Sequence, residues 1–128
     1  MGQYMRMILL AFFMLLTPTA FAADRNFEIQ CNYDGNQQEI NACSVRDYKT
    51  ADGKLNEIYK EAMSKLPPQK QLSLREEQRA WLKKLDPDCK TKAKSSEGGS
   101  IWPLEYYGCL QSSTELRVKE LEHWLAGQ

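Results

Sequence analysis

The sequence predicts an all-α fold, a small hairpin or bundle of three helices with two disulfides. Over three long segments, apolar residues recur at steps of three and four, the spacing that places side chains on one face of a helix. No segment shows a useful length of the apolar–polar alternation that a half-buried strand needs. The four cysteines are an even set behind a stretch typical of an export signal, which favours disulfides over free thiols.

We interpret residues 1–22 as a secretory signal peptide. Arg6 supplies the positive charge, ten apolar residues follow from Met7 to Leu16, and Ala20-Phe21-Ala22 matches a small-x-small cleavage site. The alternative is a membrane anchor, but ten apolar residues are too few to cross a bilayer as a helix. We therefore expect a secreted protein, periplasmic or extracellular, with no membrane contact after cleavage.

Residues 23–128 then form the mature chain. Its length of 106 residues (128 less 22) fits one domain with a single modest core. Without Arg6 the chain has 16 basic and 17 acidic residues, a net charge of −1. Such a balance gives no field that attracts nucleic acid or an anionic membrane. We expect a monomer with no nucleic-acid partner, whose electrostatic contacts come from a local patch.

The first helix is predicted over residues 36–66, where an apolar stripe includes Leu55 and Tyr59. Gly53 interrupts it at a cost of about 1 kcal/mol relative to alanine. The segment could therefore be one bent helix or two helices, and we expect one. The proline pair that follows residue 66 ends the helix.

The second helix is predicted over residues 69–86, with Trp81 as the largest apolar group on its buried face. Pro87 lacks an N–H and restricts the residue before it, so we expect the helix to end there. A loop is predicted over residues 87–102, because it is rich in glycine and serine. The third helix is predicted from Pro103 to Ala126, since proline suits a first turn.

Antiparallel connections bring the start of the first helix, the end of the second and the start of the third to one end of the bundle. Cys43, Cys89 and Cys109 fall at that end, and Cys31 can fold back to it. We favour the pairs Cys31–Cys43 and Cys89–Cys109 because both close short segments, although Cys43–Cys89 fits the same end equally well. A zinc site is the competing hypothesis. No close Cys-x-x-Cys pair supports it, so we expect no metal.

No residue pattern predicts an enzyme or a cofactor. The single histidine, His123, lies beside Trp124 near the end of the third helix, and no nucleophile motif is present. Three polar residues lie close to apolar stripes, and we favour a hydrogen-bond network that fixes helix register over a polar binding pocket. They are Asn56, Gln78 and Arg117. The predicted structural core consists of Leu55, Tyr59, Trp81, Leu82, Tyr107 and Leu121.

The segment from Lys90 to Ser100 is the best candidate for binding a partner. Cysteines at both sides would anchor it, which reduces the entropy lost when it docks. Its lysines at alternate positions could complement an acidic cleft, whereas the simpler interpretation is a solvated spacer. The predicted contact residues are Lys90, Lys92, Lys94, Ser95 and Ser96.

Four stretches resemble the LprI-type family of secreted bacterial proteins, named after a lysozyme-inhibitor lipoprotein. The first two are Glu39-Ile40-Asn41-Ala42-Cys43 and Asp52-Gly53-Lys54-Leu55-Asn56-Glu57-Ile58-Tyr59. The third is Gln78-Arg79-Ala80-Trp81-Leu82 with Asp86 and Cys89, and the fourth is Tyr107-Gly108-Cys109 with Thr114, Arg117 and Leu121. One position departs, because Leu85 stands where the family usually has arginine, so a polar contact of that arginine is absent or replaced.

The resemblance implies an all-α, disulfide-bonded domain in the periplasm or outside the cell. It also implies a protein partner, with lysozyme inhibition as the leading function. The alternative is a structural or stress-related module of the bacterial envelope with another protein partner. A basic segment offers a physical route to inhibition, because lysozyme works with two carboxylates in a cleft.

Overall fold

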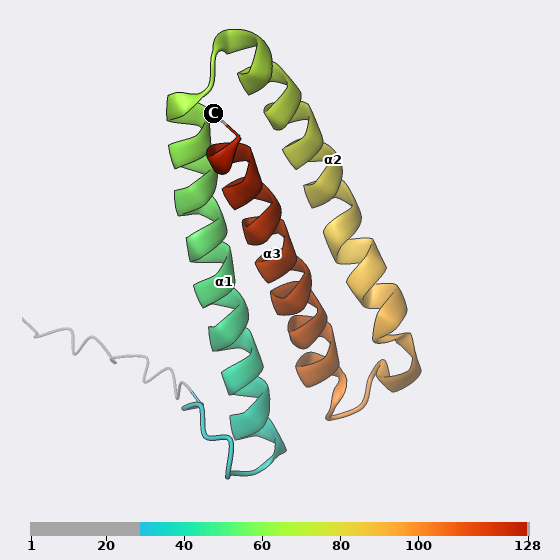
Figure 1. Cartoon of the computed structure of the whole chain (residues 1–128). Helices are drawn as coiled ribbons and strands as arrows, with labels where there is room; N and C mark the ends of the chain where they lie inside the picture. Colours follow the sequence, from blue (N-terminus) through green and yellow to red (C-terminus); the bar gives the residue numbers. More distant parts are fainter. Residues whose placement is uncertain (1–28, 128) are drawn as a thin grey trace, which may run out of the picture.

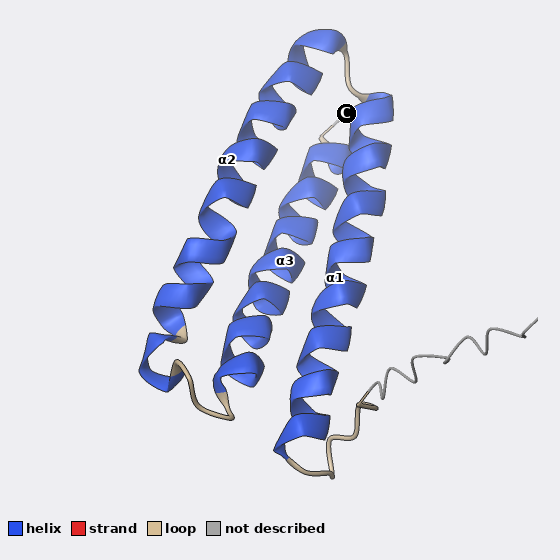
Figure 2. Cartoon of the chain, turned by 180° about the vertical axis from the view of Figure 1, so that it is seen from behind, coloured by secondary structure: helices blue, strands red, loops and turns tan. Residues whose placement is uncertain are grey.

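The computed structural model describes residues 29–127, so the predicted signal peptide lies outside the described residues. Three helices account for most of this range: α1 (Gln37–Lys65), α2 (Pro68–Lys92) and α3 (Trp102–Ala126), with a short 3₁₀ turn η1 (Lys94–Ser96) between the last two (Figures 1 and 2). The predicted all-α architecture is confirmed. Among these helices, none combines the length and apolar character that crossing a membrane requires.

Helix α1 begins at a capping box. The Asn36 side chain accepts hydrogen bonds from the backbone N–H groups of Gln38 and Glu39, and the Glu39 carboxylate accepts from the Asn36 N–H. The helix then runs unbroken through Gly53, as predicted, and ends just before the proline pair. Gly53 is tolerated because its position is exposed and the buried stripe on either side holds the helix in place.

Helix α2 differs from the prediction, because it continues through Pro87 to Lys92 instead of stopping at residue 86. Proline leaves the carbonyl of residue 83 without its helical N–H partner, but Pro87 is exposed, so water can satisfy that carbonyl. Beyond the proline, Cys89 and Ala93 are each only 1% exposed. Their burial anchors the last turn, and the predicted loop therefore shrinks to the short connection around η1.

The three helices are arranged with α3 between the other two. Figures 1 and 2 show α1 and α3 running side by side in the same direction and α2 returning in the opposite direction. Helix α3 packs mainly against α1 and less extensively against α2. The buried core between them comprises Leu55, Ile58, Ala62, Leu66, Leu74, Val118 and Leu121.

The six predicted core residues differ in burial: two are buried, three are partly buried and one is exposed. Leu55 and Leu121 are fully buried, while Tyr59 and Trp81 are partly buried and pack against the core. Tyr107 is also partly buried, but it lies with Tyr48 near the cysteines. Leu82 was predicted to be core, and this prediction is wrong because its side chain is 51% exposed. Helix α2 contacts mainly one neighbour, so its buried face is narrow.

Both favoured disulfides are present. Cys31 is bonded to Cys43 and Cys89 to Cys109, with Cα atoms 4.4 Å and 5.5 Å apart, and no cysteine is free. The alternative pair Cys43–Cys89 is therefore excluded. We call the end of the bundle that holds both disulfides the cysteine pole; it comprises the start of α1, the end of α2, η1 and the start of α3.

Candidate functional site

The predicted binding segment lies at the cysteine pole, and its first part, to Ser96, is mostly helical, whereas residues 97–100 form turns. Lys90 and Lys92 belong to the last turn of α2, and Lys94, Ser95 and Ser96 form η1. The Ser96 hydroxyl donates its one proton to two acceptors that share it, the Ala93 carbonyl at 3.0 Å and the Glu105 carboxylate. Ser96 therefore fastens η1 to the start of α3, whereas Ser95 is exposed.

The three lysines are not equivalent. The Lys90 ammonium forms an ion pair with Asp86, with Nζ and Oδ2 2.8 Å apart. Lys92 and Lys94 are exposed, and their ammonium groups have no ion-pair partner within residues 29–127. Two of the three predicted ammonium groups are thus available to a partner. The third is already neutralised by its neighbour.

Four aromatic rings cross the pole in a row. Trp102 stacks on Tyr106 with ring centroids 4.7 Å apart and planes inclined by 8°. Tyr106 meets Tyr107 edge to face at 5.1 Å, and Tyr107 lies 6.0 Å from Tyr48 of α1. Aromatic pairs in these geometries add about 0.5–1.5 kcal/mol each beyond their buried area. The row therefore stiffens the start of α3 against α1.

Asp86 links this row to α2. Its carboxylate accepts a hydrogen bond of 2.6 Å from the Tyr106 hydroxyl as well as pairing with Lys90. The hydrogen bond from Lys90, followed by that from Tyr106, lowers the pKa of Asp86. Burial, followed by the bond to Asp86, raises the pKa of Tyr106. At neutral pH the carboxylate is therefore ionised and the phenol protonated, so the pair joins α2 to α3 as a charge-assisted hydrogen bond.

A depression of about 200 Å³ opens at the pole, between the end of α2, the residues around η1 and the start of α3. The residues that line it are Lys90, Thr91, Lys94, Glu97 and Trp102. Sequence reasoning did not place Trp102 in a site. The available signal was an unassigned apolar pair, Ile101 and Trp102, directly before a helix-starting proline.

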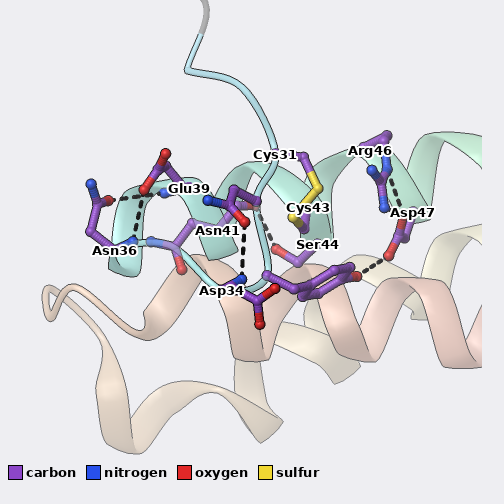
Figure 3. The surroundings of a disulfide bond; sticks show 11 residues. Cys31, Asp34, Asn36, Glu39, Asn41, Cys43, Ser44, Arg46 and Asp47 are labelled. Carbon is purple, nitrogen blue, oxygen red and sulfur yellow. Dashed lines mark hydrogen bonds and ion pairs between the residues drawn. A yellow bond between two sulfur atoms is a disulfide. The ribbon is translucent and has the colours of Figure 1, made fainter.

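The lead-in before α1 is fixed at the same pole. Figure 3 shows the Cys31–Cys43 disulfide holding this segment along α1, and nearby the Arg46 side chain pairs with Asp47 at 2.8 Å. The Tyr33 hydroxyl also donates to Asp47, and the hydrogen bonds of Tyr33 and then Arg46 lower the pKa of Asp47. The Asn41 side chain donates to the Ser100 carbonyl at 2.8 Å. The start of α1 thereby also supports the connection to α3.

The predicted polar network is found in part. The Arg117 guanidinium, 6% exposed, donates to the Gln78 side-chain oxygen at 2.9 Å and to Glu120 at 2.7 Å. Asn56 is not a member, because it is exposed and its side chain donates instead to Asp52, one turn earlier on α1, at 3.4 Å. The network thus joins α2 to α3 only.

A second hollow lies between α1 and α3, and its volume is about 540 Å³. Buried Ala51 and Val118 contribute apolar surface, while the charged residues around it have both signs. They are Asp47, Lys54, Glu115, Lys119 and Glu122. This mixture favours no single class of ligand. Residues 29–127 also contain no group of three potential metal ligands.

Comparison with known proteins identifies one family. The family described as "Lysozyme inhibitor LprI" matches residues 30–121. An uncharacterized protein of Rhizobium meliloti (strain 1021) is 30% identical over 122 residues, which span 85% of this chain and 88% of that protein. No solved structure matches the chain at a significant level.

Proposed function

The chain belongs to the LprI family of lysozyme inhibitors, and from this premise we propose that it acts outside the cytoplasm as a monomeric, non-enzymatic protein that binds and inhibits a lysozyme. The family supports the inhibitor role and a protein partner. The two disulfides fit an oxidising compartment. The site within the chain must be argued from its own geometry.

The observation that carries the proposal is a pair of exposed ammonium groups that have no ion-pair partner among residues 29–127 and lie on a segment held by a disulfide. Lys92 and Lys94 extend from the last turn of α2 and from η1, and the Cys89–Cys109 bond ties this segment to α3. An ordered segment loses little conformational entropy when it docks. We therefore assign the contact with the partner to Lys92 and Lys94, with Ser95 beside them.

The electrostatic match follows from lysozyme chemistry. A lysozyme cleft holds two carboxylates, one kept protonated by apolar surroundings and one ionised. An ammonium group placed in the cleft pairs with the ionised carboxylate and blocks the substrate. Lys90 contributes less, because its ion pair with Asp86 at 2.8 Å must first be given up. Inhibition should weaken as salt rises, since charges at an interface rim act mainly on the association rate.

The test is a lysis assay of a peptidoglycan suspension with purified mature protein against several types of lysozyme. The double variant Lys92→Ala/Lys94→Ala should inhibit about tenfold less well, which corresponds to about 1.4 kcal/mol. The matched control is Lys60→Ala/Lys70→Ala, which removes two exposed lysines away from the pole and should leave inhibition unchanged. Absence of inhibition at micromolar protein against every lysozyme type would end the inhibitor proposal. Equal inhibition by both double variants would keep the function but remove Lys92 and Lys94 from the mechanism.

A further inference from the structure

We propose that the depression lined by Trp102 is a saccharide subsite that takes one sugar unit of an uncharged or weakly charged glycan chain. This binding does not require a lysozyme. It would add direct contact with cell-wall glycan to the proposed inhibition. The inference depends on three features of the depression: a fixed aromatic wall, hydrogen-bonding groups of both kinds, and nearly balanced charge.

The aromatic wall is the indole of Trp102. One face of the ring stacks on Tyr106 at 4.7 Å, and Tyr106 is held in turn by its 2.6 Å hydrogen bond to Asp86. The indole is therefore oriented before any ligand arrives. A flat, fixed aromatic surface suits the apolar face that the axial C–H groups of a pyranose ring present. Trp102 is only partly buried, so its ring remains available at the depression.

The polar groups around the indole include both donors and acceptors. Lys94 offers N–H donors, Thr91 offers a hydroxyl, and Glu97 offers carboxylate oxygens that only accept. The Thr91 hydroxyl already donates to the Pro87 carbonyl at 2.9 Å, which leaves its lone pairs to accept from a ligand. A sugar presents hydroxyl and amide groups that both donate and accept. Its edge can therefore satisfy this mixed set.

Charge within the depression argues against a simple anion. Lys90 is neutralised by Asp86 at 2.8 Å, so the remaining charges are the ammonium of Lys94 and the carboxylate of Glu97. These two charges cancel. A small carboxylate or phosphate held inside the depression would gain from Lys94 but would be repelled by Glu97, which lines the same depression. A neutral ligand that forms many hydrogen bonds meets no such penalty.

The depression is also held in shape before binding. Cys89–Cys109 joins the end of α2 to α3, and the bond from Ser96 to Glu105 holds η1 against the same helix. The Asn41 side chain supports the connection through the Ser100 carbonyl at 2.8 Å. Small-ligand sites are usually preformed concavities with an aromatic surface and a few placed polar groups. The depression meets this description.

Two probes test the proposal with the full mature chain. Isothermal titration calorimetry with a β-1,4-linked tetramer of N-acetylglucosamine measures binding to sugar alone. Sedimentation with insoluble peptidoglycan measures binding to the polymer, and free stem peptides serve as a competitor that carries no sugar. We expect binding of the tetramer, retention on peptidoglycan, and no effect of the stem peptides.

Variants locate the binding at the depression. Trp102→Leu keeps an apolar side chain but removes the flat ring, and should weaken tetramer binding about tenfold. Lys94→Ala and Glu97→Ala lie at exposed positions, so they test the polar groups even if Trp102→Leu folds poorly. Lys92→Ala removes a neighbouring ammonium that does not line the depression, and should leave binding unchanged.

Several outcomes would overturn the inference. The first is that the tetramer gives no heat of binding. The second is that Trp102→Leu, Lys94→Ala and Glu97→Ala all bind the tetramer as tightly as the unchanged protein. The third is that stem peptides alone displace the protein from peptidoglycan. If the unchanged protein binds the tetramer but inhibits no lysozyme, only the proposed function is rejected. Conversely, a chain that inhibits lysozyme but ignores the tetramer would reject only the saccharide subsite.

Discussion

Arg117 is a charged residue buried between two helices, where its hydrogen bonds decide what its burial costs. Its guanidinium is buried, yet it faces the uncharged side chain of Gln78 at 2.9 Å, and its acidic partners Glu120 and Glu77 are mostly exposed. Burying a polar group costs free energy unless its hydrogen bonds are made. The contact between Gln78 and Arg117 therefore fixes the register of α2 against α3. If either helix slid along the other, both buried side chains would lose their hydrogen-bond partner.

The single variants Arg117→Met and Gln78→Leu should each lower the free energy of unfolding by about 1–3 kcal/mol, since each leaves the other polar group buried without its partner. The double variant should lose less than the sum, because it strands neither group. Urea unfolding of all four proteins measures this coupling. Strictly additive losses would show that the hydrogen bond sets no register.

The lowered pKa of Asp86 predicts that the free energy of unfolding depends on pH. Its pKa in the folded protein is lowered from the ordinary value of 3.8 by Lys90 and then Tyr106, so folding favours the ionised carboxylate. The resulting stabilisation is complete above the unfolded-state pKa and is lost as pH falls from about 4 through the lower folded-state pKa. Asp86→Asn should therefore flatten the acid limb of a plot of unfolding free energy against pH. Asp88→Asn, two residues away and exposed, is the control that should keep the limb.

At the scale of the elements, α2 is the helix in which a proline lies inside a regular segment. Pro87 sits on the exposed side, so its missing N–H costs a hydrogen bond that water can replace. The turn after it is retained because Cys89 and Ala93 are buried and Cys89 is bonded to α3. Tertiary anchoring here outweighs the local preference of proline.

Replacing that proline should reveal the local cost. Pro87→Ala restores the N–H and should raise the free energy of unfolding by about 1–3 kcal/mol. A small part of this gain is lost, because alanine gives the unfolded chain more conformational entropy than proline does. Pro68→Ala is the matched control, because Pro68 occupies the first turn of α2, where proline is favourable. That variant should be neutral or slightly less stable. If Pro87→Ala is instead destabilising, the helix path set by the proline is needed to bring Cys89 to Cys109.

The same helix shows what a sequence can and cannot predict. Proline and the glycine- and serine-rich stretch after it are strong local signals, so a loop from residue 87 was the natural expectation. Burial of Cys89 depends on a residue 20 positions later, and no local pattern contains that information. Leu82 failed for a related reason, since periodicity gives a face of a helix but not how many neighbours cover it.

At the scale of the whole molecule, the number and order of the helices and the clustering of the cysteines followed from periodicity and chain direction. The segment predicted to bind a partner lies at the cysteine pole between Cys89 and Cys109, but its helical part was not predicted. The depression beside Trp102 was also missed, because it is assembled from the end of α2, the residues around η1 and the start of α3. Such a surface exists only after the connection between two helices has been placed.

The connectivity of the disulfides also bears on how the chain matures. Each bond joins cysteines that are consecutive in the sequence, 12 and 20 residues apart, and neither bond spans the other. During passage across a membrane, the cysteines would emerge in the order in which they pair. A thiol oxidase that links each cysteine to the next one exposed would therefore produce the native bonds directly. Maturation of this chain would then require an oxidant, but no isomerase that rearranges mispaired disulfides.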